Sequence, residues 1–268
     1  MRSDKSPAAI PARRRSGRRS LVAPVLAVLL GASLRPATAA VPPDIVILCE
    51  PTLRPVLQQV ARQWRQQSGG RMRLFSTSTA AALREAGYGA RADVVFGAGA
   101  ELAIAARAQG VLRSDDLIGL WQDSLVLATR TMPATTDAVL PLDRLLGIIG
   151  NSRVATIDGS LPPDTLTALE LAGAPLARHV DAASSEDAVQ MLDSGDVAFA
   201  LLYATDLAAH RQFRQGATFA PETVAPALVW AGQSSQSRSP EMAHFAEFLK
   251  QPEVGRLLEA GGLRRMAP

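Results

Sequence analysis

From residue 45 onward, short apolar runs alternate with segments of helical periodicity, and this order constrains the fold more than any other feature of the sequence. The expected order is strand, helix, strand, helix, strand, helix, at residues 45–48, 53–64, 72–75, 80–86, 93–96 and 101–109. Such an order favours a parallel sheet with right-handed crossovers. The sequence therefore predicts an α/β fold in which helices flank the sheets.

A second α/β unit is expected between two later apolar strands, at residues 124–129 and 224–231. Two lobes joined by two strands would form a hinge, and ligand sites favour such interfaces. We predict lobe 1 at residues 41–128 plus 226–268 and lobe 2 at residues 129–225. Each lobe is expected to be a mainly parallel sheet flanked by helices, with further helices at residues 141–149, 165–172, 185–192, 241–250 and 252–259.

The first forty residues have the pattern of an export signal. A basic segment at residues 13–19 precedes an apolar segment at residues 21–34, which is short for a membrane span. Small residues at Ala37, Thr38 and Ala39 provide a cleavage site. The pair Arg18 and Arg19 leaves both the Sec and the Tat route open. The sequence therefore predicts a periplasmic protein whose residues 1–40 are removed.

The charge of the chain changes sign once this segment is left out. Residues 1–40 hold eight of the 28 basic residues and one of the 25 acidic residues, which leaves 20 basic and 24 acidic residues. Nucleic-acid binding requires a basic face that persists in the functional protein. We therefore expect no nucleic-acid partner.

Residues for catalysis or metal binding are scarce. The sequence has no nucleophile elbow and no phosphate-binding loop. Its three histidines, His179, His210 and His244, show no metal-ligand spacing. The sequence predicts a protein that is not an enzyme and that has neither a metal site nor a cofactor.

Polar side chains instead follow several predicted strands. Thr52 follows the first strand, the run at residues 76–79 follows the second, and Tyr203 follows a later one. Open α/β sheets bind ligands at the carboxyl ends of their strands. Hydroxyls and unpaired N–H groups at a helix start can also cradle an anion. For the run at residues 76–79, a simple helix N-cap is the alternative interpretation.

Several segments, in order and spacing, resemble the periplasmic molybdate-binding proteins, the solute receptors of molybdate ABC importers. The resemblance is carried by residues 45–60, Phe75 to Thr79 with Glu85-Ala86-Gly87, residues 92–96, residues 124–127, Glu186-Asp187-Ala188, residues 202–206, and the final pattern from Phe245 to Pro252. It runs over nearly the whole chain after residue 40.

This resemblance implies a two-lobed type II periplasmic binding protein that holds molybdate or tungstate as an oxyanion through uncharged donors. It also implies a monomer that delivers this ligand to an ABC permease in the inner membrane. The positions that match the ligand-binding residues of the family are Thr52, Ser78 or Thr77, Asp164, Ala188 and Tyr203.

Two other hypotheses remain open. Glu50 and Pro51 stand where the family usually has small residues, and Asp164 adds a second carboxylate near the expected site. The same fold could therefore bind a different small solute that these acids select. The protein could also be an accessory or sensory binding protein that is not coupled to transport.

Overall fold

The computed structural model describes residues 44–113, 117–130, 139–140, 142–157, 179–222 and 224–266. Every described element belongs to one compact unit, Ala40–Pro268. The predicted export signal and the predicted helix at residues 165–172 lie outside the described residues.

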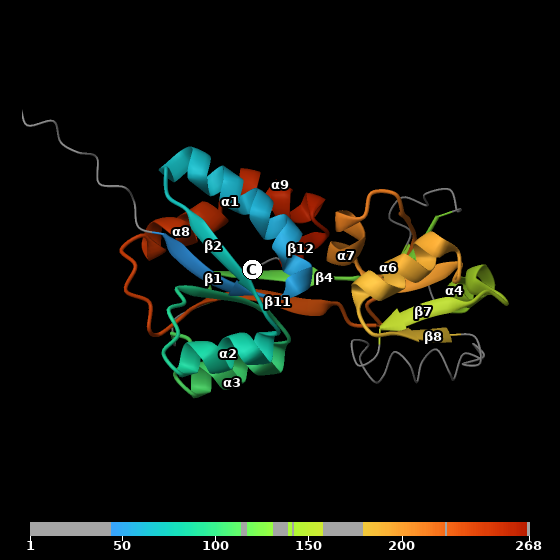
Figure 1. The fold of residues 1–268 in the computed structure, drawn as a ribbon, viewed down its shortest axis with the longest axis horizontal. Helices are drawn as coiled ribbons and strands as arrows, with labels where there is room; N and C mark the ends of the chain where they lie inside the picture. The colour runs from blue at the N-terminus through green and yellow to red at the C-terminus, as the bar shows by residue number, and fades with distance from the viewer. Residues whose placement is uncertain are drawn as a thin grey trace, which may run out of the picture. The chain divides into compact units, whose positions relative to one another are not determined.

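The first sheet has six strands in the order β12-β4-β11-β3-β1-β2 (Figure 1). These strands are β1 (Ile45–Cys49), β2 (Met72–Ser76), β3 (Val94–Ala98), β4 (Gly119–Asp123), β11 (Ala227–Gln233) and β12 (Leu263–Arg265). Strand β1 pairs in parallel with β2 and β3, whereas β11 and β12 pair antiparallel with their neighbours. Three of its five strand pairings are antiparallel, so this sheet is mixed and the prediction of a mainly parallel sheet is wrong here. The antiparallel pairings all involve β11 or β12, which come from the C-terminal part of the chain.

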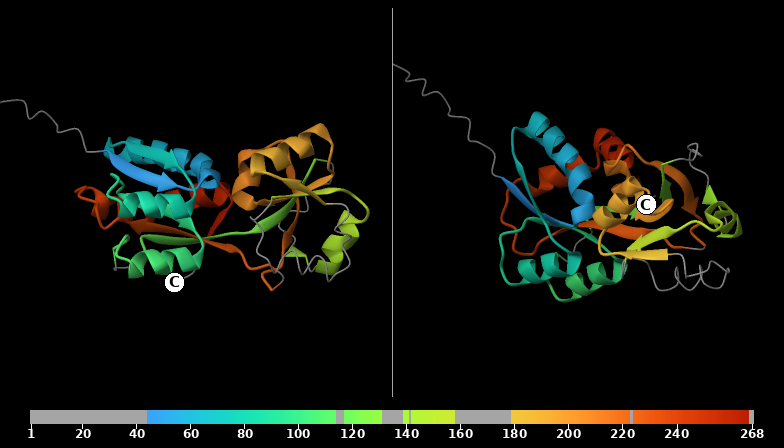
Figure 2. Two further views of the ribbon diagram at one scale, coloured as in Figure 1. Left: turned by 60° about the horizontal axis from the view of Figure 1, so that its bottom comes forward. Right: turned by 45° about the vertical axis from the view of Figure 1, so that its right-hand side comes forward.

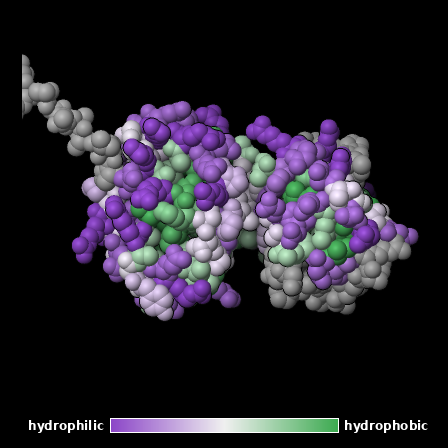
Figure 3. Space-filling model, viewed as in Figure 1, coloured by the Kyte–Doolittle hydropathy of each residue, from purple (hydrophilic) through white to green (hydrophobic). Residues whose placement is uncertain are grey.

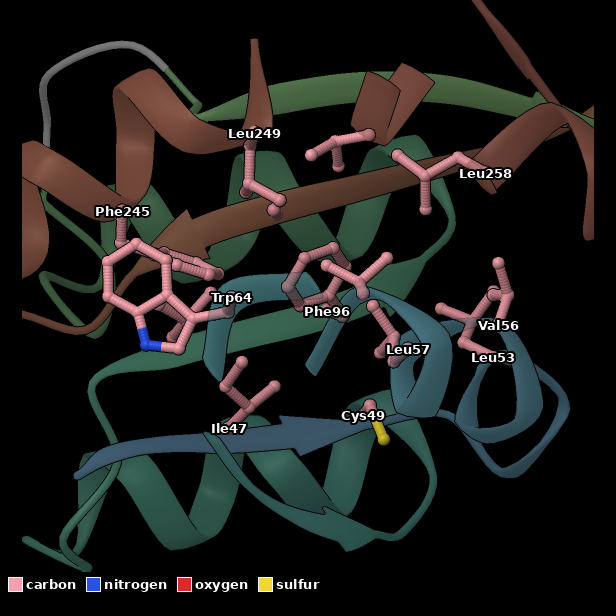
Figure 4. Close-up of a cluster of buried hydrophobic side chains, with 14 of the residues drawn as sticks. Ile47, Cys49, Leu53, Val56, Leu57, Trp64, Phe96, Phe245, Leu249 and Leu258 are labelled. Atoms are coloured by element: carbon pink, nitrogen blue, oxygen red, sulfur yellow. The ribbon is translucent and has the colours of Figure 1, made fainter. Parts of the chain in front are cut away.

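Helices cover both faces of this sheet (Figure 1). Helix α1 (Arg54–Ser68) packs on one face with α8 (Met242–Leu249) and α9 (Pro252–Ala260), and α2 (Thr79–Gly87) and α3 (Ala100–Ala108) pack on the other. The indole of Trp64 meets the rings of Phe245 and Phe248 edge-on, at centroid distances of 5.5 and 5.0 Å. Figure 4 shows Trp64 and Phe245 in the core that fixes α1 and the segment before it.

The second sheet also has six strands, in the order β6-β10-β5-β9-β7-β8. Its elements are β5 (Leu125–Thr129), β6 (Val139–Leu140), α4 (Leu142–Ile149), β7 (Val154–Ile157), β8 (His179–Ala182), α6 (Ser185–Ser194), β9 (Phe199–Tyr203), α7 (Ala204–Ala209) and β10 (Arg214–Phe219). Strand β7 pairs in parallel with β8 and β9, while β5 pairs antiparallel with β9 and β10. The predicted α/β class, with two sheets flanked by helices, is confirmed.

The chain passes between the two sheets at two places. Strand β4 belongs to the first sheet and β5 to the second, with Ser124 alone between them. The return runs from β10 to β11. Figure 2 shows the green segment with β4 and β5 running from one sheet to the other. The division into lobes at residues 41–128 plus 226–268 and 129–225 stays a prediction.

Hydrophilic residues cover most of the face shown in Figure 3, with apolar patches between them. Among the described large apolar side chains, Tyr88 and Ile104 are the most exposed, at 90% and 67%. Within the described part of the chain, every helix is too short or too polar to cross a membrane.

Candidate functional site

A cavity of about 320 Å³ draws its wall from both sheets. The first sheet and the turn after β1 contribute Glu50, Thr52, Leu53, Ala98, Asp123, Ala227 and Val229, and the second sheet and its helices contribute Ile157, Ser185, Tyr203 and Asp206. Ala98, Asp123, Ile157 and Tyr203 are the last residues of their strands. The cavity therefore lies at carboxyl ends of strands, where α/β sheets bind ligands.

Glu50 places its carboxylate on the first residue of α2. Oxygen Oε1 of Glu50 accepts hydrogen bonds from both the backbone N–H and the hydroxyl of Thr79, each at 2.5 Å. The Thr79 hydroxyl in turn accepts a hydrogen bond from the N–H of Ala98 at 2.9 Å. A carboxylate of the chain itself therefore occupies a donor pair at the start of a helix, the kind of position that attracts an anion.

Asp123 joins the end of β4 to the start of α7. Its Oδ2 accepts a hydrogen bond from the Thr205 hydroxyl at 2.5 Å, and its Oδ1 accepts one from the Thr205 N–H at 3.3 Å. Asp123 is only 4% exposed. Burial raises the pKa of this carboxyl to about 7, although the hydrogen bonds from Thr205 favour its ionised form. Near neutral pH, Asp123 is therefore close to half-protonated.

Asp206 and Tyr203 also have raised pKa values. Burial raises the pKa of Asp206, and the Ser185 hydroxyl and the Tyr203 N–H partly oppose this effect. Burial is again the main reason that the pKa of Tyr203 is raised, with smaller contributions from the charges of Asp123 and Asp206. The phenol of Tyr203 therefore remains a neutral hydrogen-bond donor at physiological pH.

The charged side chains that line the cavity are all acidic. They are Glu50, Asp123 and Asp206, and none of the described lining residues is Lys, Arg or His. The described ranges also contain no group of three or more His, Cys, Asp or Glu side chains placed to hold a metal ion. This arrangement offers hydroxyl groups of Thr52 and Tyr203 together with carboxylate acceptors, while the hydroxyl of Ser185 is bonded to Asp206.

The structure brings together two of the six predicted site residues: Thr52, in the short helix Pro51–Leu53 after β1 of the first sheet, and Tyr203, at the end of β9 of the second sheet. Ser78 is the N-cap of α2, where its hydroxyl accepts a hydrogen bond from the Ala81 N–H at 3.3 Å. The N-cap interpretation of the run at residues 76–79 therefore describes Ser78 in this structure.

The other predicted residues do not line the described wall. Thr77 is half-buried, and its N–H donates to the carbonyl of Cys49. Ala188 is fully buried in the second turn of α6, and its N–H donates to the carbonyl of Ser184. Asp164 lies outside the described residues. The ligand contacts proposed for these residues stay predictions.

Sequence reasoning missed Asp123, Ser185 and Asp206 as lining residues. Asp123 immediately precedes the apolar strand predicted at residues 124–129, and Asp206 lies three residues after Tyr203. A signal was therefore present, since both acids stand beside strand ends. The pairing of Asp123 with Thr205 is not visible in the sequence, because 82 residues separate the two.

Comparisons with known proteins identify the family. The profile of the bacterial extracellular solute-binding protein family matches residues 45–264. The chain belongs to this family. The family consists of extracellular solute-binding proteins, so the cavity between the sheets is a candidate solute site. No curated protein sequence matches the chain.

Solved structures share the fold at low sequence identity. The substrate-binding domain of a proposed molybdenum ABC transporter of Clostridium difficile superposes with a TM-score of 0.68 at 15% identity, covering 84% of this chain and all of that one. The periplasmic molybdate-binding protein of Azotobacter vinelandii gives 0.63 at 19% identity and covers 84% and 99%. A tungstate-binding protein of Desulfovibrio alaskensis gives 0.61 at 11% identity and covers 84% and 100%. These likenesses establish the two-lobed fold of periplasmic binding proteins.

Proposed function

We propose that this protein captures a small solute in the cavity between its two sheets and delivers it to an ABC permease in the inner membrane. The observation that carries the proposal is one cavity, of a size suited to small ligands, lined by Thr52 from one sheet and Tyr203 from the other. In this account residues 1–40 direct export to the periplasm, and the protein acts there as a monomer.

Solute capture requires the two lobes to respond to the ligand. A ligand that touches both lobes favours the arrangement in which its contacts from both are complete. The two passages of the chain between the sheets, at Ser124 and between β10 and β11, are the proposed hinge. The hydroxyls of Thr52 and Tyr203 would then approach the solute together.

An oxyanion such as molybdate or tungstate is the first candidate ligand. Two of the structural neighbours are named as molybdate- and tungstate-binding proteins. The hydroxyls of Thr52 and Tyr203 are uncharged donors that can replace water around an oxyanion. This candidate requires the carboxyls of the cavity to be protonated or turned away when the anion binds.

A different small solute is the second candidate, and the acids in the cavity wall favour it. Glu50 already holds the donor pair at the start of α2. Two like charges about 4 Å apart repel by about 4 kcal/mol at an effective dielectric constant of about 20. A dianion placed beside Glu50 and Asp206 would face such repulsion, whereas a solute that donates hydrogen bonds would not.

Calorimetric titration of the purified protein with molybdate, tungstate and sulfate separates these candidates. Binding of molybdate or tungstate supports the oxyanion, and absence of heat with all three rejects it. The variant Glu50→Ala gives a second criterion. Removing this carboxylate should leave oxyanion affinity unchanged or higher, whereas it should abolish binding of a solute that Glu50 selects.

A further inference from the structure

Asp206 carries a buried acceptor that the described protein does not satisfy. The residue is 6% exposed, it lines the cavity, and its Oδ2 atom has no hydrogen-bond partner among the described residues. A buried polar atom without a partner is rare in folded proteins and destabilises the fold. This oxygen is therefore a point at which a guest in the cavity could gain a hydrogen bond that nothing else provides.

Asp123 accepts hydrogen bonds from Thr205 at both of its carboxylate oxygens. Glu50 accepts both of its hydrogen bonds from Thr79 at Oε1 and is only half-buried. Asp206 is the carboxyl of the wall that combines nearly complete burial with an oxygen that has no partner among the described residues. A hydroxyl or amine donor on the guest would complete its coordination.

We propose, on the basis of the receptor function proposed above, that the solute is a small protonated amine whose N–H group donates to Oδ2 of Asp206. The three acids of the wall favour a cation over a neutral donor, because each contributes negative charge when ionised. A metal cation is disfavoured, since the described residues lack a cluster suited to one. A protonated amine would donate a hydrogen bond to the unpaired oxygen and would be attracted by the acidic side chains of the wall.

The rest of the wall suits an organic cation. Leu53, Ile157 and Val229 provide apolar surface for a hydrocarbon portion, and the ring of Tyr203 can lie against an ammonium group. With about 30 Å³ for each non-hydrogen atom, the value for liquid water, the cavity holds a guest of roughly ten such atoms. A compact monoamine or diamine fits this limit.

Calorimetric titration of the purified protein at pH 8 with n-butylamine and 1,4-diaminobutane tests the proposal. The neutral analogues 1-butanol and 1,4-butanediol serve as controls of matched size, and molybdate serves as the anionic probe. At least one of the two amines should bind, and its neutral analogue should bind at least about tenfold more weakly. Equal binding of the amine and its neutral analogue would overturn the proposal.

The variant Asp206→Asn tests whether the amine binds to the carboxyl of Asp206. Loss of one partner of a buried charged hydrogen bond should weaken amine binding by about 30-fold or more. Glu186→Gln, an exposed acid in the first turn of α6, is the matched control and should leave the affinity unchanged. Because the Oδ2 atom of Asp206 has no partner, the variant should fold with a melting temperature at or above that of the parent. Unchanged amine affinity in folded Asp206→Asn would contradict the assignment.

The pH dependence of binding provides a test that needs no variant. The groups around Asp206 are Glu50, Asp123, Tyr203, the Ser185 hydroxyl and His210, which follows α7. Alkylamines stay protonated between pH 5.5 and 8.5, since their pKa resembles the value of about 10.4 for lysine. Amine affinity should rise over this interval as Asp123, whose pKa is raised to about 7, ionises, whereas oxyanion affinity should fall.

The outcomes also separate this inference from the receptor function. Binding of molybdate without binding of either amine overturns the amine proposal and leaves the receptor function in place. Absence of binding by both amines overturns it as well. The receptor function itself fails only when a broad panel of small solutes, amines and anions included, leaves the melting temperature unchanged.

Discussion

The carboxylate of Glu50 accepts hydrogen bonds from the protein itself. The donors at the start of α2, which the sequence suggests as an anion cradle, bond to this side chain through Thr79. The hydroxyl of Thr79 also links Glu50 to the end of β3, through the N–H of Ala98. Glu50 therefore stabilises the junction of β1, α2 and β3 while it forms part of the cavity wall.

Replacing Glu50 by Ala should lower the free energy of unfolding by about 1–2 kcal/mol. The change removes a charged acceptor from two donors, and water replaces it only in part because Glu50 is half-buried. Urea denaturation measures the loss. Glu85→Ala, an exposed acid in the same helix, is the control and should change stability by less than about 0.5 kcal/mol. Equal effects of the two substitutions would contradict this role of Glu50.

Asp123 should make the stability of the protein depend on pH. Its pKa is about 7 in the folded protein and about 3.9 in an unfolded chain, so the folded state binds the proton more tightly. Its contribution is therefore fully present below about pH 4 and is lost as the pH rises to about 7. The total is on the order of 4 kcal/mol.

The variant Asp123→Asn isolates this contribution from those of other carboxyls. It keeps the shape of the side chain and removes the titration, so the difference in unfolding free energy between the variant and the parent should grow in favour of the variant from pH 4 to pH 8. Denaturation curves at several pH values measure it. A difference that stays constant with pH would show that Asp123 titrates normally.

At the scale of elements, two helices, one beside each sheet, begin with a serine N-cap. Ser78 caps α2 through the Ala81 N–H, and Ser184 caps α6 through the Asp187 N–H. Each Ser→Ala change should lower the unfolding free energy by about 1 kcal/mol. Ser78→Ala should leave solute affinity unchanged, because Ser78 is a cap outside the described wall. A selective loss of molybdate binding in Ser78→Ala would instead support the oxyanion site predicted from the sequence.

Gly262, before β12, lies against the start of α7. Its φ of +96° suits glycine, and a Cβ there would meet the carbonyl carbon of Ala204 at 2.4 Å. Gly262→Ala should therefore destabilise the protein by more than about 2 kcal/mol, because backbone atoms must move. Gly255→Ala in α9 is the matched control. A Cβ added at Gly255 would meet open space, so this substitution should stabilise the helix by about 0.5–1 kcal/mol. Thermal melting compares the two, and equal signs would refute the packing described for Gly262.

Most helices and the long apolar strands could be predicted because their own residues carry the pattern. Strand β4 was missed because three of its five residues, Gly119, Gln122 and Asp123, are not typical of a strand. Strand β10 was missed because its first residues, Arg214, Gln215 and Gly216, are not typical of a strand. Its place is set by pairing with β5, which is a tertiary effect.

At the scale of the whole molecule, two lining residues of the candidate cavity were predicted from the sequence, but the two buried acids in its wall were not. Thr52 and Tyr203 could be predicted as lining residues because each stands at the carboxyl end of a strand, where α/β sheets bind ligands. Asp123 and Asp206 meet in the wall only after the chain has crossed between the sheets. The sequence therefore predicts uncharged donors with Glu50 and Asp164 near them, whereas the folded chain adds the buried acids Asp123 and Asp206 to the wall.

The proposed receptor function requires residues beside both sheets, Thr52 and Tyr203 among them, to hold one solute in the cavity. A crystal structure of the protein with the solute that raises its melting temperature most in a panel of amines and oxyanions is the decisive experiment. We predict electron density for that solute in contact with Thr52, Tyr203 and Asp206 together. Density at another surface, or in contact with residues of one sheet only, would contradict it.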